Sequence, residues 1–173
     1  MAESHNQFGD IIGIRADAVG QPGHRRFRLL VEAANGRTAL LWLEKEQLFD
    51  LAIALKRVVA IEGDLGEAGV EAGRLARALD FDATELDFQV GRMSLQHDNE
   101  REEVSVTVYS AEPSDDVELP DLSFTVTFGL ADVFASDAMI LCASGRPLCP
   151  LCRMPVGQER HICPMRNGHG HLE

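Results

Sequence analysis

The sequence predicts an α+β protein: an antiparallel sheet built from two β-β-β-α halves, followed by a small cysteine-rich module at the C-terminus. Two observations carry this prediction. Three strand-like segments and then a helical segment occur twice along the chain. In addition, 45% of the 173 residues are hydrophobic, which suffices for one ordinary core with an appendage. We therefore expect one duplicated α+β domain at residues 1–145 and a separate tail at residues 146–173.

The first half opens with an apolar strand at residues 8–14 and a turn at residues 20–23. Residues 26–32 alternate in part between apolar and polar side chains, as a half-buried strand does. Asn35-Gly36 is a hairpin signal, and it predicts that residues 38–43 return as a third strand.

A helix is expected from about Glu44 to Ile61, because apolar residues recur there at helical spacing. The apolar residues on one face are Leu48, Leu51, Leu55, Val58 and Val59. The following segment, residues 62–85, consists mostly of glycine, alanine and charged residues, and residues 70–79 can form a short helix within it.

The second half repeats the order of elements. Residues 86–93 form its first predicted strand, and a polar turn at residues 96–101 leads to a strand at residues 104–109. After an acidic loop at residues 111–121, residues 122–128 alternate with a period of two and predict a third strand. An amphipathic helix is then expected from Leu130 to Ala143, ending at Gly145. This order predicts an internal repeat, although few residues are identical between the halves.

The tail contains three cysteines and a histidine in the pattern C-x2-C-x8-H-x-C. Thiolate and imidazole groups at this density are typical of a tetrahedral zinc site, so we predict zinc bound by four residues. These residues are Cys149, Cys152, His161 and Cys163. Four protein ligands leave no open position for water, which favours a structural, zinc-ribbon-like module over a catalytic metal.

Two other histidines, His169 and His171, compete with His161 for the fourth position. The first cysteine pair alone also fits a disulfide or a redox motif. Such a motif is expected between a strand and a helix, whereas Pro150 and Pro155 here follow an expected helix end. The fourth cysteine, Cys142, is interpreted as a small buried hydrophobic residue of the last helix.

Charge is distributed unevenly between the body and the tail. The whole chain carries −12. The residues from Ser144 onward carry four arginines against two glutamates, or +2, so the body carries −14. An acidic body repels a phosphate backbone, so we expect no nucleic-acid binding except through the basic tail, and we expect a protein partner.

No secretory signal is visible at residues 1–10, and no apolar stretch is long enough to cross a bilayer. We therefore expect a cytoplasmic protein in which the thiols stay reduced and available to a metal.

Several segments resemble the bacterial family known as domain of unknown function 3090. The matching segments are Gly20-Gln21-Pro22-Gly23-His24-Arg25, Leu43-Glu44-Lys45-Glu46-Gln47, Phe88-Gln89-Val90-Gly91-Arg92-Met93, the run from Ala143 to Cys152, His161-Ile162-Cys163-Pro164 and Asn167-Gly168-His169. The resemblance spans nearly the whole chain and implies one continuous unit, but no activity. Arg153 departs from the glycine that usually follows the second cysteine of such knuckles.

Two classes of function remain open. The first is an interaction or scaffold protein whose zinc module presents Arg146, Arg153, Arg160 and Arg166 to a partner. The second is an enzyme with a site at the Gly20 to Arg25 loop, where His24 would move protons and Arg25 or Arg26 would hold an anionic small molecule. A plain tight turn has the same sequence signature as this loop.

Overall fold

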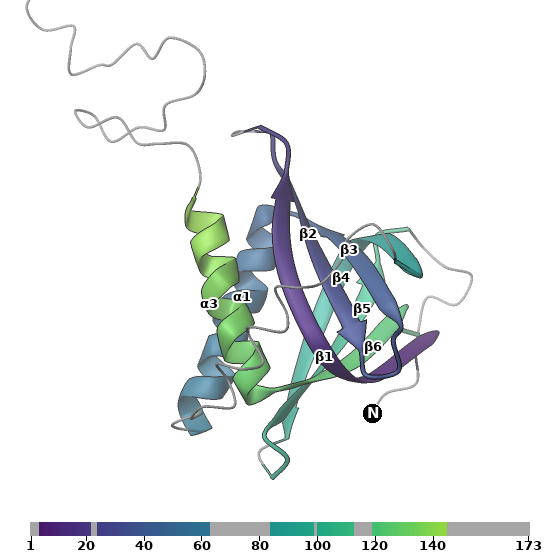
Figure 1. Ribbon diagram of the computed structural model, residues 1–173, viewed down its shortest axis with the longest axis vertical. Coiled ribbons are helices and arrows are strands. Elements are labelled where there is room, and N and C mark those ends of the chain that lie inside the picture. The colour runs from purple at the N-terminus through teal and green to yellow at the C-terminus, as the bar shows by residue number, and fades with distance from the viewer. Residues whose placement is uncertain (1–3, 22–23, 63–83, 99, 113–118, 145–173) are drawn as a thin grey trace, which may run out of the picture.

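The structure is a computed structural model that describes residues 4–21, 24–62, 84–98, 100–112 and 119–144 (Figure 1). The predicted short helix at residues 70–79 and the tail at residues 146–173 lie outside the described residues. The elements described are, in chain order, β1 (Asn6–Val19), β2 (Arg26–Ala33), β3 (Thr38–Leu43), α1 (Lys45–Glu62), β4 (Leu86–Asp98), β5 (Glu103–Ser110), β6 (Leu122–Thr127) and α3 (Phe128–Ala143).

The order of three strands and a helix therefore occurs twice, as predicted, and the α+β class is confirmed. Whether the two halves form an internal repeat at the level of sequence stays a prediction. The tight turn predicted at Asn35-Gly36 is present: Gly36 has a φ of +81°, and its N–H donates to the carbonyl oxygen of Ala33 at 2.9 Å. A positive φ is a conformation that glycine adopts at little cost.

The prediction of a wholly antiparallel sheet is wrong. Within each half the strands pair antiparallel, but β3 pairs parallel to β4, and β1 pairs parallel to β6. These two junctions close the six strands into a barrel in the order β1-β2-β3-β4-β5-β6. Parallel neighbours need a long crossover connection. The segment between β3 and β4, which contains α1, is such a connection, and β1 and β6 are separated in the chain by the four other strands and α1.

The two long strands, β1 and β4, each change neighbour at an irregularity. β1 pairs with β6 as far as Asp10 and with β2 from Ile11 onward. β4 pairs with β3 as far as Gln89 and with β5 from Val90 onward. A register shift follows directly in each strand, between Ile11 and Gly13 and between Val90 and Arg92. Such bulges bend a strand, which lets one strand serve two parts of the barrel.

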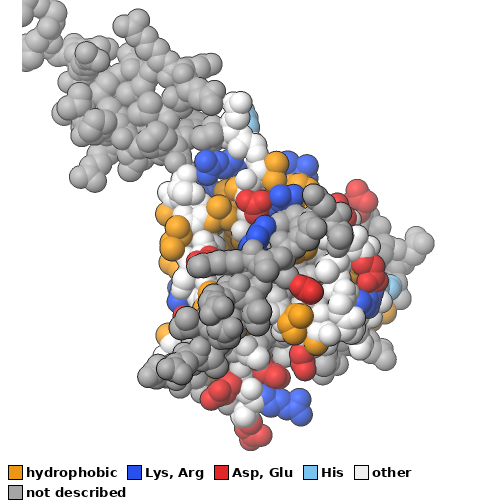
Figure 2. Space-filling model, in the orientation of Figure 1, with side chains coloured by type: hydrophobic (Ala, Val, Ile, Leu, Met, Phe, Trp, Pro, Cys, Tyr) orange, Lys and Arg blue, Asp and Glu red, His pale blue; other side chains and the backbone are white. Residues whose placement is uncertain are grey.

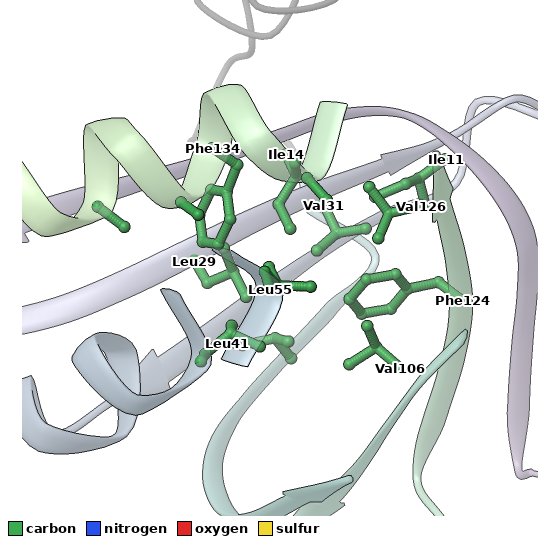
Figure 3. Close-up of a cluster of buried hydrophobic side chains, with 14 of the residues drawn as sticks. Ile11, Ile14, Leu29, Val31, Leu41, Leu55, Val106, Phe124, Val126 and Phe134 are labelled. Carbon is green, nitrogen blue, oxygen red and sulfur yellow. The ribbon is translucent and has the colours of Figure 1, made fainter. Parts of the chain in front are cut away.

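The helices α1 and α3 pack against each other and lie together on one side of the strands (Figure 1). One hydrophobic cluster joins side chains from all six strands and both helices. In Figure 3, Leu55 of α1 and Phe134 of α3 extend toward Leu29 and Leu41 of the sheet. The helices therefore complete the barrel core, and neither half encloses a core alone.

A side-chain hydrogen bond caps the start of each of these two helices. Thr127 precedes α3, and its hydroxyl accepts a hydrogen bond from the Leu130 N–H at 3.4 Å. Before α1, the Glu44 N–H donates to the Gln47 side-chain oxygen at 2.9 Å. Both bonds satisfy backbone donors that a helix start leaves free.

Candidate functional site

A groove of about 300 Å³ lies between the N-terminal half of α1 and strand β4. It is lined by Gln47, Asp50, Leu51, Ala54, Gly91, Arg92, Met93 and Leu95. Its lining is mostly apolar with a few polar groups, which is the composition usual for binding sites of this size.

The groove results from a difference between the halves. α3, the helix of the second half, packs along β1, the first strand of the first half. The equivalent contact of α1 would be with β4, but the larger contacts of α1 are with α3 and β2. α1 therefore leaves part of β4 uncovered. On β4, Val90 is buried, but Met93 and Leu95 are only partly buried although they face the core side.

Gly91 and Gln47 form one end of the groove. The Gln47 side-chain amide donates to the carbonyl oxygens of Val90 and Gly91, both at 3.2 Å. A Cβ atom at position 91 would lie 2.7 Å from the Ser110 carbonyl oxygen, so only glycine fits without movement of the backbone. The glycine thus permits the bulge, and the glutamine fixes it to α1.

Beyond this bulge, β4 has an edge to which no strand among the described residues pairs, because β3 pairs only with Leu86 to Gln89. The Phe128 N–H donates to the Glu102 carbonyl oxygen, so residues 102 and 128 form a hydrogen-bonded pair at the end of the β5–β6 ladder. Hydrogen-bonded pairs alternate along antiparallel strands, so the even-numbered residues of β5 bond to β6 and its odd-numbered residues bond to β4. Their β4 partners are Arg92, Ser94, Gln96 and Asp98. By alternation, the N–H and C=O groups of Met93, Leu95 and His97 point toward the other edge.

The charges at the groove are placed asymmetrically. The Arg92 guanidinium lies over the Tyr109 ring, 3.7 Å from its centroid, in a cation–π contact. Asp50 is exposed on the α1 side of the groove. The rim on that side therefore presents a carboxylate, which favours a cationic group in whatever binds there.

The predicted loop at Gly20 to Arg25 forms the connection between β1 and β2, of which residues 22 and 23 are not described. Gly20 has a φ of +106°, and the His24 N–H donates to the Gln21 carbonyl oxygen at 2.9 Å. His24 is exposed, and the groove described above includes neither His24 nor Arg25. The Arg25 guanidinium instead donates to the Ser144 carbonyl oxygen at 3.0 Å, at the end of α3.

The predicted zinc ligands Cys149, Cys152, His161 and Cys163 lie outside the described residues, as do His169 and His171. Within the part of the chain that the structure describes, no three histidine, cysteine or acidic side chains gather as a metal site would require.

The prediction that Cys142 is a small buried residue of the last helix is confirmed. Cys142 is buried in α3 with 3% of its surface exposed, and burial raises the pKa of its thiol, with the nearby Lys45 opposing that shift. It is a buried side chain of the hydrophobic core.

The groove was missed in the sequence. The first strand of the second half was predicted to end at residue 93, with a polar turn at residues 96–101, but β4 continues to Asp98. The one available signal was Gly91 inside a strand pattern, since an interior glycine often marks a bulge or a close approach of backbone.

The fold and the groove together define a class of protein: a six-stranded α+β barrel with a helix pair over one side and an open groove beside β4. The family model described as "Protein of unknown function (DUF3090)" matches residues 6–163, and the chain belongs to this family. Neither the curated proteins nor the solved structures contain a match to the chain. None of the described helices is long and apolar enough to cross a membrane.

Proposed function

We propose that this protein is a cytoplasmic interaction module whose C-terminal tail binds one structural zinc ion through Cys149, Cys152, His161 and Cys163. The zinc would fold a segment too short to form a hydrophobic core of its own. The folded tail would present Arg146, Arg153, Arg160 and Arg166 to a protein partner.

The observation that carries the proposal is the anchoring of Ser144, the last described residue before the tail. α3 ends at Ala143, and the next carbonyl, that of Ser144, accepts a hydrogen bond from Arg25 on the β1–β2 connection. The tail therefore starts from a point that is fixed to the barrel on two elements. A tail that carries four metal ligands and is attached at a fixed point suits a module that presents a binding surface to a partner.

The family match supports the choice of ligands. It extends through Cys163 and ends there, so it includes all four predicted ligands and leaves His169 and His171 outside. The burial of Cys142 is consistent with the same choice, because a buried protonated thiol is a poor metal ligand and the three cysteines of the tail remain.

Surface charge favours a protein partner over nucleic acid. Figure 2 shows acidic and basic side chains interspersed over the described part of one face. The chain as a whole carries −12, whereas a protein that binds a phosphate backbone usually has a patch or stripe of basic side chains.

The enzyme alternative receives less support. It requires a concave site that contains His24 and an arginine. His24 is exposed on the β1–β2 connection, and Arg25 is engaged with the Ser144 carbonyl.

Metal analysis tests the zinc site. The purified protein is expected to contain close to one equivalent of zinc, and a Cys149→Ser variant far less. A Cys142→Ala variant is the matched control and is expected to keep its zinc. Zinc content below about half an equivalent in the wild-type protein would contradict a filled four-ligand site.

Affinity capture tests the interaction role. The full chain is immobilised and exposed to extract of its own cells, with the Cys149→Ser variant in parallel. We expect a partner that the wild-type protein retains and the zinc-deficient variant loses. A partner held equally by both variants would remove the tail from the interaction, and the absence of any partner would overturn the proposed function.

A further inference from the structure

We propose that the edge of β4 at Met93, Leu95 and His97 binds an extended peptide segment of a partner protein as an added strand. Apolar side chains of that segment would enter the groove, and a basic side chain would face Asp50. This inference rests on the proposed role as an interaction module, and it names residues of the barrel rather than of the tail.

The first supporting observation is the backbone of β4. Its hydrogen bonds to β5 use Arg92, Ser94, Gln96 and Asp98, so the donors and acceptors of the alternate residues point to an edge that no described strand occupies. The side chains of Ser94, Gln96 and His97 are exposed along this stretch. An open strand edge is the template on which proteins add a strand from another chain.

The second observation is the groove beside this edge. Met93 and Leu95 pair with the buried Val108 and Val106, so all four side chains share the core side of the sheet. A strand added at the edge would place alternate side chains on this same side, over Leu51 and Ala54. Main-chain bonds would give affinity, and the apolar groove would select side chains at alternate positions.

Charge decides which occupant fits best. Residues 1–143 carry −14, so a second copy of the chain would be repelled, and a basic segment would be attracted. Asp50 is exposed at the rim, whereas Arg92 is engaged with the Tyr109 ring. The surface therefore fits an extended segment in which apolar residues alternate with polar or basic ones.

The test uses the full-length ¹⁵N-labelled protein and a nine-residue acetylated probe peptide in which valine alternates with lysine or threonine. Amide hydrogen exchange is measured by NMR with and without the probe. At a probe concentration ten times its Kd, the amides of Met93, Leu95 and His97 are expected to exchange about tenfold more slowly. The amides of Ser94 and Gln96 already bond to β5 and are expected to change little.

Two controls separate strand addition from general adhesion. A probe with N-methylated valines keeps the side chains but loses the donors that face β4, and we expect it not to bind. Leu95→Lys places a charge on the groove side and is expected to weaken probe binding at least about tenfold. Gln96→Lys adds the same charge one residue away on the opposite face and is expected to leave binding nearly unchanged.

Several results would overturn the inference. These are unchanged exchange up to about 1 mM probe, equal binding of the N-methylated probe, or edge amides already protected in the free protein. In the last case, sedimentation distinguishes a second copy of the chain from another segment of the same chain. If a partner is captured from extract but Leu95→Lys retains it, the edge assignment fails and the interaction role stands.

Discussion

The side-chain amide of Gln47 on α1 lies 3.2 Å from the carbonyl oxygen of Gly91 on β4, across the end of the groove. The same amide reaches the Val90 carbonyl, and the Gln47 side-chain oxygen accepts from the Glu44 N–H. One side chain therefore caps the start of a helix and holds the strand at the residue where it changes neighbour. The hydrogen bonds of Gln47 therefore connect α1 to β4, although few other side chains of these two elements contact each other.

Replacing Gln47 is expected to destabilise the fold through both sets of bonds. Gln47→Ala would lose the cap at Glu44 and leave the Val90 and Gly91 carbonyls without this donor, at a cost of about 1–2 kcal/mol in the free energy of unfolding. Urea unfolding measures the change. Asp50→Ala, one turn along the same helix and exposed, is the control, with an expected change within about 0.5 kcal/mol. Equal effects of the two variants would contradict the role assigned to Gln47.

Gly91→Ala is expected to destabilise the β4–β5 pair. The new methyl group would lie 2.7 Å from the Ser110 carbonyl oxygen, so the backbone must move, at a cost of about 1–3 kcal/mol. The control is Gly36→Asn, since Gly36 has open space around it and asparagine tolerates a positive φ. We expect that control to lose less than about 1 kcal/mol, and thermal or urea unfolding distinguishes the two.

The helix pair offers a third prediction. Lys56 of α1 and Asp132 of α3 form an ion pair in which each side chain is 34% exposed. A double-mutant cycle with Lys56→Met and Asp132→Asn is expected to give a coupling energy of about 0.5–1 kcal/mol that shrinks in high salt. The comparison pair, Arg101 with Asp98, is more exposed and 3.9 Å apart, so its coupling is expected near zero. A salt-independent coupling at Lys56 would contradict this account.

Most elements of the fold could be predicted because their signals are local. The period of two at residues 122–128 and the apolar face of α1 follow from the directions in which side chains leave a single strand or a single helix. The partial alternation of residues 26–32 also has a local cause. Leu30 is buried on the side opposite the core, where it packs with Leu40 and Trp42, so apolar residues occur on both faces of β2.

The barrel and the groove could not be predicted because they depend on pairings between distant segments. Nothing near Ala39 or Leu86 in the sequence specifies that β3 and β4 run parallel. The long strands were predicted too short for a related reason. Arg15, Asp17, Ser94 and Gln96 interrupt the apolar pattern, because these parts of β1 and β4 are only partly covered. The zinc site stays a prediction that rests on the spacing of its ligands.

The buried thiol of Cys142 gives a prediction about alkaline pH. Burial raises the pKa of this thiol in the folded state above its ordinary value of about 8.5. At lower pH the thiol is protonated in both states, and its contribution to stability is fully present. As the pH rises past the unfolded pKa, only the unfolded chain ionises, so stability falls until the folded pKa is passed. Unfolding free energies of the wild-type protein and Cys142→Ala should therefore converge as the pH rises from about 7.5 through and beyond the unfolded thiol pKa of about 8.5. The cysteines of the tail are common to both proteins and cancel in the comparison, so a constant difference across this range would show that Cys142 does not titrate as its burial requires.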